Sequence, residues 1–165
     1  MNRTFVAILI GLSLLFIENT LWSAIGWTRV LPDLSIWFVV LLALQGSSLS
    51  NVFSAFAFGT LQDISLGSYI GPHAAGYMLA YVVVRQMVES GVVTGSLGLF
   101  SATGVAWMVS LFGQYITLVF ASGHSVGSGI DLSLLMWGFS TSLFGALTIG
   151  RLRGLLRVHK KSAWR

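Results

Sequence analysis

Long apolar runs with almost no charge between them constrain this chain most. Asp, Glu, Lys and Arg make up 8 % of its 165 residues, whereas an ordinary soluble domain carries roughly 25 %. So few charges cannot cover a soluble fold of this size, which argues against a soluble enzyme and excludes a disordered chain. The runs are continuous rather than alternating, which favours helices over a β-barrel. The sequence therefore predicts an all-α polytopic membrane protein.

Bilayer thickness sets the number of helices. A spanning helix needs about 20 residues, so six helices would use about 120 residues and leave about 45 for loops and a tail. The apolar runs and the breakers between them predict helices over residues 5–22, 34–44, 52–66, 73–88, 97–121 and 132–149. We expect a six-helix transmembrane domain over 1–150 and a basic cytoplasmic tail over 151–165. The first run also fits a signal peptide, but no convincing small-x-small cleavage site follows it, so we expect a retained helix.

Polar residues and a proline mark two of the helix starts. Pro32 suits the first turn of the second helix, where its missing N–H group is not needed. Asp33 suits the positive N-terminal end of the same helix. Ser50 or Asn51 is expected to cap the third helix.

The distribution of basic residues orients the chain, because cytoplasmic segments carry an excess of Lys and Arg. Six of the nine basic residues lie in the tail: Arg151, Arg153, Arg157, Lys160, Lys161 and Arg165. With six helices, both termini are then cytoplasmic, Arg3 and Arg85 lie inside, and only Arg29 lies outside. The tail should attract anionic phospholipid. Nucleic acid is not an expected partner, because tails of membrane proteins commonly have this composition.

The five acidic residues fall into two groups. The chain contains Glu18, Asp33, Asp63, Glu89 and Asp131. Asp33 and Asp131 stand at predicted helix starts, and Glu89 follows Arg85 by four residues and can pair with it. Glu18 and Asp63 lie within predicted membrane helices, where an ionisable residue costs about 2.5 to 3.5 kcal/mol on insertion scales and needs a partner or a function.

The predicted topology gathers these two acids with other polar residues in the outer half of the protein. The candidate cluster contains Glu18, Arg29, Asp33, Asp63 and His73. We favour a structural network in which Asp63 accepts hydrogen bonds from the backbone of the turn over 67–71. A ligand or ion site and a docking site for a partner are the alternatives.

Catalytic patterns have little support in the sequence. His73, His124 and His159 stand in a helix start, a loop and the tail, without the spacing of a helical metal site. No nucleophile-elbow pattern frames a serine, and the absence of cysteine excludes thiol-ligated metals. The chain is predicted not to be an enzyme, with no metal and no cofactor.

Glycines and tryptophans suggest how the helices pack. Gly138 and Gly145 are seven residues apart, on one face of the sixth helix, where they permit close approach by another helix. Packing within the chain is the default interpretation, and a partner's helix is the alternative. The six tryptophans are interpreted mainly as interface anchors or lipid-facing bulk: Trp22, Trp27, Trp37, Trp107, Trp137 and Trp164.

The segment over residues 31–87 resembles the rod shape-determining protein MreD family. Pro32-Asp33-Leu34 opens a helix, Gly59 and Asp63 supply a Gly-x-x-x-Asp element, and Gly67 with Ile70-Gly71 supplies the spaced glycines that follow it. The resemblance covers about a third of the chain. The remainder agrees in hydropathy and in its basic tail.

This resemblance implies a non-catalytic role in the bacterial inner membrane. Members of the family belong to the cell-elongation machinery that builds the peptidoglycan of the side wall. They bind the membrane helix of MreC, and through it connect to MreB, to RodA and to a class B penicillin-binding transpeptidase. The family is also similar to the S components of energy-coupling factor transporters. The alternative function is therefore vitamin binding at the outer cluster, in an S-component-like bundle.

Overall fold

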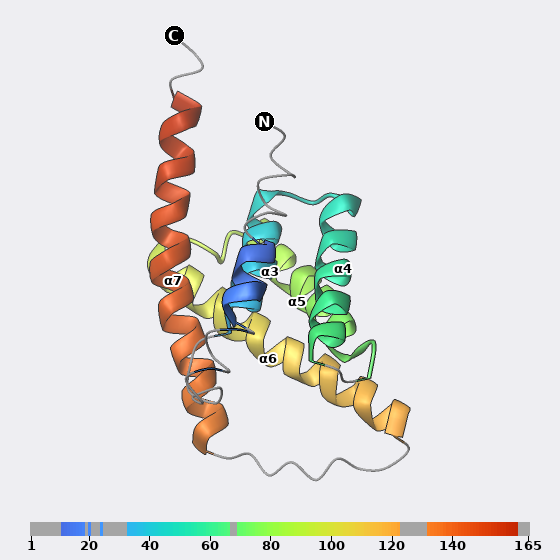
Figure 1. Ribbon diagram of the computed structural model, residues 1–165. Coiled ribbons are helices and arrows are strands. Elements are labelled where there is room, and N and C mark those ends of the chain that lie inside the picture. Colours follow the sequence, from blue (N-terminus) through green and yellow to red (C-terminus); the bar gives the residue numbers. More distant parts are fainter. Residues whose placement is uncertain are drawn as a thin grey trace.

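The part of the chain that the structure describes is all-α and contains six helices of more than one turn. The computed structural model describes residues 11–18, 20, 24, 33–66, 69–122 and 132–161, with the helix backbone alone at 121–122, 132–135, 150 and 152–161. A helix over residues 11–17 is followed by α3 (Leu34–Gln45), α4 (Leu49–Ser65), α5 (Pro72–Glu89), α6 (Gly95–Ser122) and α7 (Leu132–Lys161) (Figure 1). Each of the six predicted helices has a counterpart among the described residues, and most predicted ends lie within a few residues of the observed ones.

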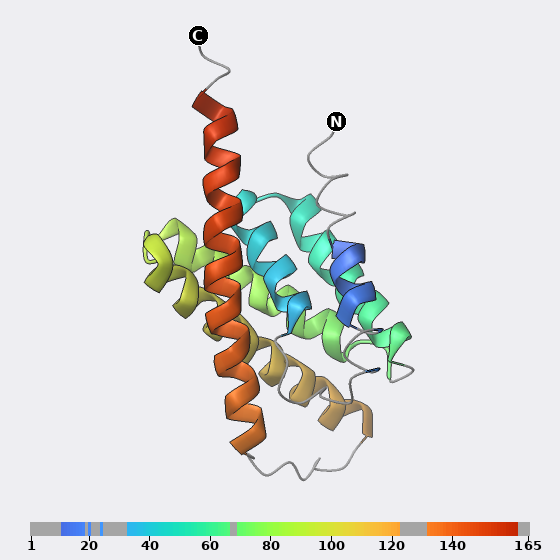
Figure 2. The same ribbon diagram turned by 60° about the vertical axis from the view of Figure 1, so that its left-hand side comes forward.

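Helix α3 lies at the centre of the bundle. It contacts α4, α5, α6 and α7, and most of its residues are buried. From α3 to α7, consecutive helices run in alternate directions, and α6 crosses the bundle obliquely between α5 and α7 (Figures 1 and 2). The chain therefore wraps four helices around a short central one.

Local sequence explains where α3 and α4 begin. Asp33 is the N-cap of α3, and its side chain accepts a hydrogen bond from the Ile36 backbone. The predicted cap of α4 was wrong, because Ser48 is the N-cap and accepts from the Ser50 N–H. Ser50 and Asn51 belong to the first turn of α4 instead. Pro32 lies outside the described residues, as does Asp131.

The predicted end of the last helix at Ile149 was wrong. Helix α7 continues without a break to Lys161. The segment after Ile149 contains no proline, and its leucine, arginine and lysine residues are good helix formers that outweigh the glycines at 150 and 154. The backbone of the basic segment is therefore a helical extension, which projects beyond the other helices in Figures 1 and 2.

Two close backbone approaches hold α5 against its neighbours. A Cβ atom added at Gly59 of α4 would lie 2.5 Å from the Ala74 Cα of α5. A Cβ atom added at Gly113 of α6 would lie 2.8 Å from the Gly76 Cα of α5. Only glycine allows backbones to approach this closely, so these positions fix both helix crossings.

The glycine face of α7 packs within the chain. A Cβ atom added at Gly138 would collide with the Trp107 indole, and one at Gly145 would lie 2.7 Å from Thr103 Cγ2 and 2.9 Å from Trp37 Nε1. This face is therefore filled by α3 and α6, and a partner's helix could lie there only by displacing the two indoles.

The interpretation of the tryptophans was wrong for Trp37 and Trp107. They are only 8 % and 6 % exposed, and the Trp37 indole N–H donates to the Thr141 carbonyl at 3.0 Å. Trp137 is half-buried and makes an edge contact with Trp107. The glycines of α7 leave room for large rings, so burial of ring area outweighs placement at an interface. The other three tryptophans lie outside the described residues.

Candidate functional site

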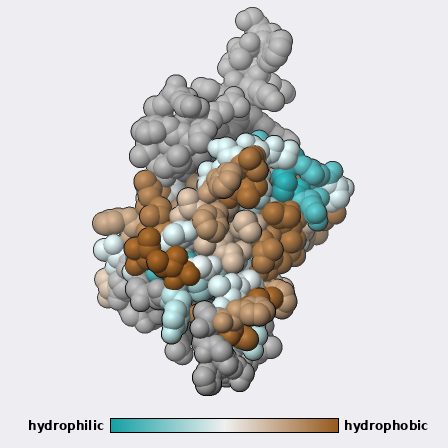
Figure 3. Space-filling model, turned by 90° about the vertical axis from the view of Figure 1, so that its right-hand side faces the viewer, coloured by the Kyte–Doolittle hydropathy of each residue, from teal (hydrophilic) through white to brown (hydrophobic). Residues whose placement is uncertain are grey.

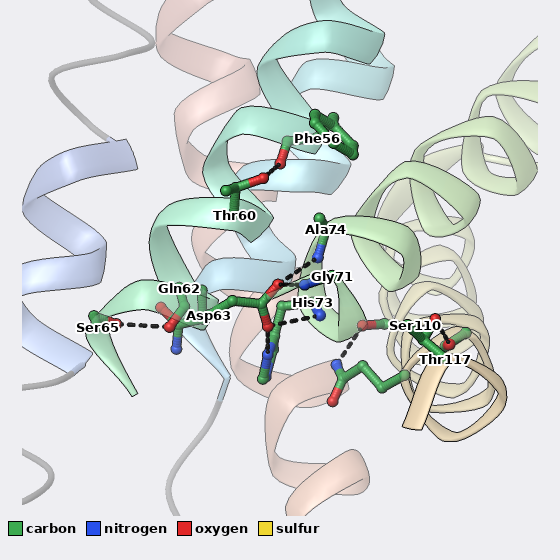
Figure 4. Close-up of polar contacts among 12 residues, drawn as sticks. Phe56, Thr60, Gln62, Asp63, Ser65, Gly71, His73, Ala74, Ser110 and Thr117 are labelled. Atoms are coloured by element: carbon green, nitrogen blue, oxygen red, sulfur yellow. Dashed lines mark hydrogen bonds and ion pairs between the residues drawn. The ribbon is translucent and has the colours of Figure 1, made fainter. Parts of the chain in front are cut away.

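Asp63 at the end of α4 caps the start of α5. Its Oδ2 accepts from the Gly71 N–H at 2.8 Å and from the Ala74 N–H at 3.3 Å, and its Oδ1 accepts from the His73 N–H at 3.0 Å (Figure 4). The predicted hydrogen bond from the turn to Asp63 is present at Gly71. The side chain is fully buried.

The start of α5 needs such a partner. The first N–H groups of a helix have no acceptor within the helix, and they carry its positive end. The N-cap residue of α5 is Gly71, with φ of +127° and no side chain to cap with. Pro72 removes one of the free donors, and the Asp63 carboxylate accepts from the neighbouring ones. The close approach at Gly59, one turn earlier on α4, allows this contact.

His73 adds a fourth donor to the same carboxylate. Its ring Nδ1 lies 2.7 Å from Asp63 Oδ1, and the side chain is 20 % exposed. The ring also makes an edge contact with Tyr77, one turn further along α5. Asp63 and His73, predicted to share a cluster, are therefore in direct contact.

Two further carboxylates hold the start of α3. Asp33 Oδ1 accepts from the Ile36 N–H at 3.1 Å, while the Asp33 backbone N–H donates to Thr141 Oγ1 of α7 at 2.8 Å. Glu18 Oε2 accepts from the Ser35 N–H at 3.0 Å and from the Ser35 hydroxyl at 2.6 Å. The predicted placement of Asp33 at a helix start is confirmed, and Glu18 has a partner.

The two capped helix starts form one group of residues, which we call the carboxylate cluster. It consists of Glu18, Asp33, Ser35, Asp63, His73, Tyr77 and Thr141. The helices that carry the two starts, α3 and α5, pack against each other, and the buried Tyr77 ring makes an edge contact with His73. The sequence predicted the three acids and His73. Arg29 lies outside the described residues, as do Gly67 and His124.

Three members of the cluster were missed from the sequence. Ser35 stands in the first turn after Asp33, a position where a short hydroxyl side chain is a recognisable signal. Tyr77 lies one turn after His73 on the same helix. Thr141 has no local signal, because it is 108 residues from Asp33.

At the C-terminal end of α3, side chains of other helices donate hydrogen bonds to backbone carbonyl groups. Arg85 Nη1 donates to the Ala43 carbonyl at 3.1 Å, and Arg85 Nε pairs with Glu89 at 2.8 Å. The predicted pair of Arg85 and Glu89 is confirmed. The contact with α3 was missed, since the two residues are 42 positions apart.

Two more side chains complete this end of α3. The Tyr81 hydroxyl donates to the Gly46 carbonyl at 3.0 Å. The Asn51 amide donates to the same carbonyl at 3.0 Å and to the Leu42 carbonyl at 3.3 Å. We call Asn51, Tyr81 and Arg85 the donor cluster. Last-turn carbonyls of a helix lack partners within the helix, and these side chains supply them.

The carboxylate cluster is therefore built to hold helices. The Asp63 carboxylate binds four donors, and one oxygen of Glu18 binds two. Among the residues that the structure describes, no group of three His, Cys, Asp or Glu side chains is placed to hold a metal ion. Two buried side-chain atoms in that part of the chain lack a hydrogen-bond partner, namely Gln62 Oε1 and Trp107 Nε1.

Comparison with known proteins gives no relative: no protein-family model, curated protein or solved structure matches this chain.

Proposed function

We propose that the chain is a polytopic membrane protein, and the observation that carries this proposal is the large number of apolar side chains on its surface. The core is mostly apolar as well, and it also contains a smaller set of buried polar side chains: Asp33, Ser35, Gln62, Asp63, Thr103, Ser110, Thr141 and Ser142. Exposed large apolar side chains include Phe53, Phe56, Leu61 and Ile64 on α4, Met108, Phe112 and Phe120 on α6, and Phe139, Phe144 and Leu147 on α7. Figure 3 shows apolar groups spread over one face of the molecule. Lipid is the solvent that suits such a surface.

Helix lengths give partial support to a membrane location. In the described part of the chain, one helix, over Gly95–Phe120, is long and apolar enough to cross a bilayer, and α3 is a shorter apolar helix. The core helix of a soluble protein can pass the same test, so the exposed apolar surface is the stronger argument. A bacterial inner membrane with both termini in the cytoplasm is the location we propose.

Within the membrane, the function we propose is that of a non-catalytic scaffold in cell elongation, similar to the MreD family. The residues that carry the resemblance act as one structural unit. Gly59 lets α4 and α5 touch, Asp63 caps α5, and Gly71 forms the turn between them. A motif that builds a rigid helix pair suits a scaffold. The proposed partner is the membrane helix of MreC, with MreB, RodA and the transpeptidase reached through it.

The carboxylate cluster favours the scaffold over the alternative S component. Asp63 and His73 would be the ligand-binding groups of a vitamin site, yet the Asp63 carboxylate already accepts from three backbone N–H groups and from His73. A ligand would have to compete with those four contacts.

Affinity purification of the tagged chain from native membranes, followed by mass spectrometry, tests this proposal. We expect MreC, RodA and the transpeptidase to co-purify. A matched variant, Gly59→Leu, should separate α4 from α5 and lose these partners, while the exposed substitution Phe53→Leu should retain them. Co-purification of an energy-coupling transmembrane subunit with its ATPases, or of a vitamin, would overturn the scaffold. Recovery of the chain in the soluble fraction of the cells, without added detergent, would overturn the membrane location itself.

A further inference from the structure

The last part of α7, over residues 150–161, combines leucines with many basic residues and no acidic one. We propose that this segment is a docking surface for an acidic amphipathic helix of another protein. Its backbone is helical to Lys161 and projects beyond the other helices (Figures 1 and 2). The inference rests on the proposed membrane location, which places the segment on the cytoplasmic side.

The helical backbone determines which positions of the segment share a face. Consecutive positions of an α-helix are about 100° apart around its axis. Three leucines then fall on one side, and we call them the leucine stripe: Leu152, Leu155 and Leu156. Basic positions border the stripe on both sides, with Arg151 next to Leu155, and with Arg153 and Lys160 next to Leu156. Helices commonly dock through an apolar stripe bordered by charged residues, and the charges select the partner.

The chain has no acid of its own to neutralise this segment. Of its five acids, three bond the starts of α3 and α5, Glu89 pairs with Arg85, and Asp131 precedes the opposite end of α7. Arg153 and Arg157 are four residues apart, a spacing at which like charges destabilise a helix. The negative charge that offsets this repulsion therefore has to come from outside the chain.

Anionic lipid can reach only the first part of the segment. Residues 132–149 of α7 contain no charged residue and extend about 27 Å, close to a hydrocarbon thickness of about 30 Å. Ile149 is buried in the bundle and Arg151 is exposed, so the membrane surface should lie near them. The headgroup layer is about 5 to 8 Å deep on each side, whereas Lys161 is about 18 Å beyond Ile149. Turning onto the lipid would require a break in α7, which is continuous.

A second copy of the chain does not match this surface. Two copies in one membrane have the same orientation, so their α7 segments would run parallel and bring like charges together beside the leucine stripe. An acidic amphipathic helix would cover the leucines and pair with the basic positions on both borders. Charge complementarity of this kind gives an interface its specificity.

Peptide binding to the full chain in phosphatidylcholine nanodiscs tests the inference. The probe is a synthetic helix of three heptads, with leucine at positions a and d and glutamate at e and g, and fluorescence anisotropy measures its affinity. We expect binding that weakens at least about tenfold from about 50 mM to about 500 mM salt, because salt screens the charge pairs. Absence of binding, or binding that is independent of salt, would overturn the inference. Failure of the wild-type chain to enter the nanodiscs would instead reject the proposed membrane location, so the two outcomes are distinguishable.

Two double variants with equal changes of charge locate the contact. Arg153→Gln with Lys160→Gln removes the basic border beside Leu156, whereas Arg157→Gln with Lys161→Gln removes two charges on the far side of the helix. We expect the first pair to weaken peptide binding at least about tenfold and the second pair by less than about threefold. Equal losses would indicate a general attraction between charges and would contradict a docking surface.

A dye at position 156 separates a protein partner from lipid. The chain contains no cysteine, so Leu156→Cys can carry a single environment-sensitive dye. In nanodiscs that contain phosphatidylglycerol, we expect the emission of a water-exposed dye, with a shift to shorter wavelength only after the peptide is added. The same shift without peptide would place the leucine stripe on lipid and reject the inference.

Discussion

Side chains from other parts of the chain cap both ends of α3, with acceptors at one end and donors at the other. At its N-terminal end, the carboxylates of Asp33 and Glu18 accept hydrogen bonds from backbone N–H groups. At its C-terminal end, Asn51, Tyr81 and Arg85 donate to backbone carbonyls. Each end thereby satisfies the backbone groups that a helix leaves open.

The two ends differ in where their partners come from. The carboxylate cluster draws on the N-terminal helix, α4, α5 and α7, so it joins parts of the chain that are far apart in sequence. The donor cluster uses only the next two helices. Loss of the carboxylate cluster should therefore disturb the whole bundle, and loss of the donor cluster should disturb one end of it.

The largest effect is expected for Asp63→Leu. It leaves three backbone N–H groups and the His73 ring without their acceptor, and each unpaired buried group costs about 1 to 3 kcal/mol. We expect a loss of at least about 3 kcal/mol in the free energy of unfolding, measured by denaturation in detergent micelles. Asp63→Asn keeps one acceptor oxygen and should lose less. Wild-type stability combined with loss of partner binding would identify a functional carboxylate instead of a structural one.

A smaller loss is expected for Arg85→Met in the donor cluster. The apolar stem is retained, while the hydrogen bonds to Ala43 and Glu89 are removed, at a cost of about 1.5 to 3 kcal/mol for a bond to a charged group. Glu89→Gln is the matched control. It breaks only the exposed pair and should cost less than about 0.5 kcal/mol. Equal losses in the two variants would show that the contact with α3 contributes nothing.

Tyr81→Phe should have a moderate effect. It removes one hydrogen bond to the Gly46 carbonyl, which keeps its bond from Asn51, so we expect a loss of about 1 kcal/mol. Tyr81→Phe combined with Asn51→Ala leaves that carbonyl without either donor. A double-mutant cycle should then give a loss greater than the sum of the two single variants, and strict additivity would contradict the shared cap.

The smallest effect is expected for Glu18→Gln. The amide oxygen can still accept from the Ser35 N–H and hydroxyl, so we expect a change below about 1 kcal/mol. Glu18→Leu removes the acceptor and should cost more. Severe loss of stability in Glu18→Gln would mean that the negative charge, and not the hydrogen bonds, holds the start of α3.

The sequence predicts contacts between residues that are close to each other along the chain. The cap at Asp33, the Arg85–Glu89 pair and the contact of Asp63 with Gly71 all join residues within eight positions of each other, and each follows from helix geometry. Choosing Ser48 over Ser50 as the cap of α4 depends on a shift of two residues, which the polar loop does not specify.

The contacts that lie far apart in sequence could not be predicted. Thr141 meets Asp33, and Arg85 meets Ala43, only because α7 and α5 pack against α3. The burial of Trp107 depends on the space beside Gly138 on another helix. An apolar ring is equally suited to lipid and to a helix interface, so the residue type alone does not decide between them.

The unbroken course of α7 ties its two halves together mechanically. The Trp107 indole packs directly against Gly138, and this contact fixes the rotation of α7 about its own axis. Because the backbone stays helical to Lys161, that angle passes unchanged along the rod to its last turns. A substitution that changes the size of the ring at position 107 would therefore rotate α7 about its axis and change the direction in which its last turns face.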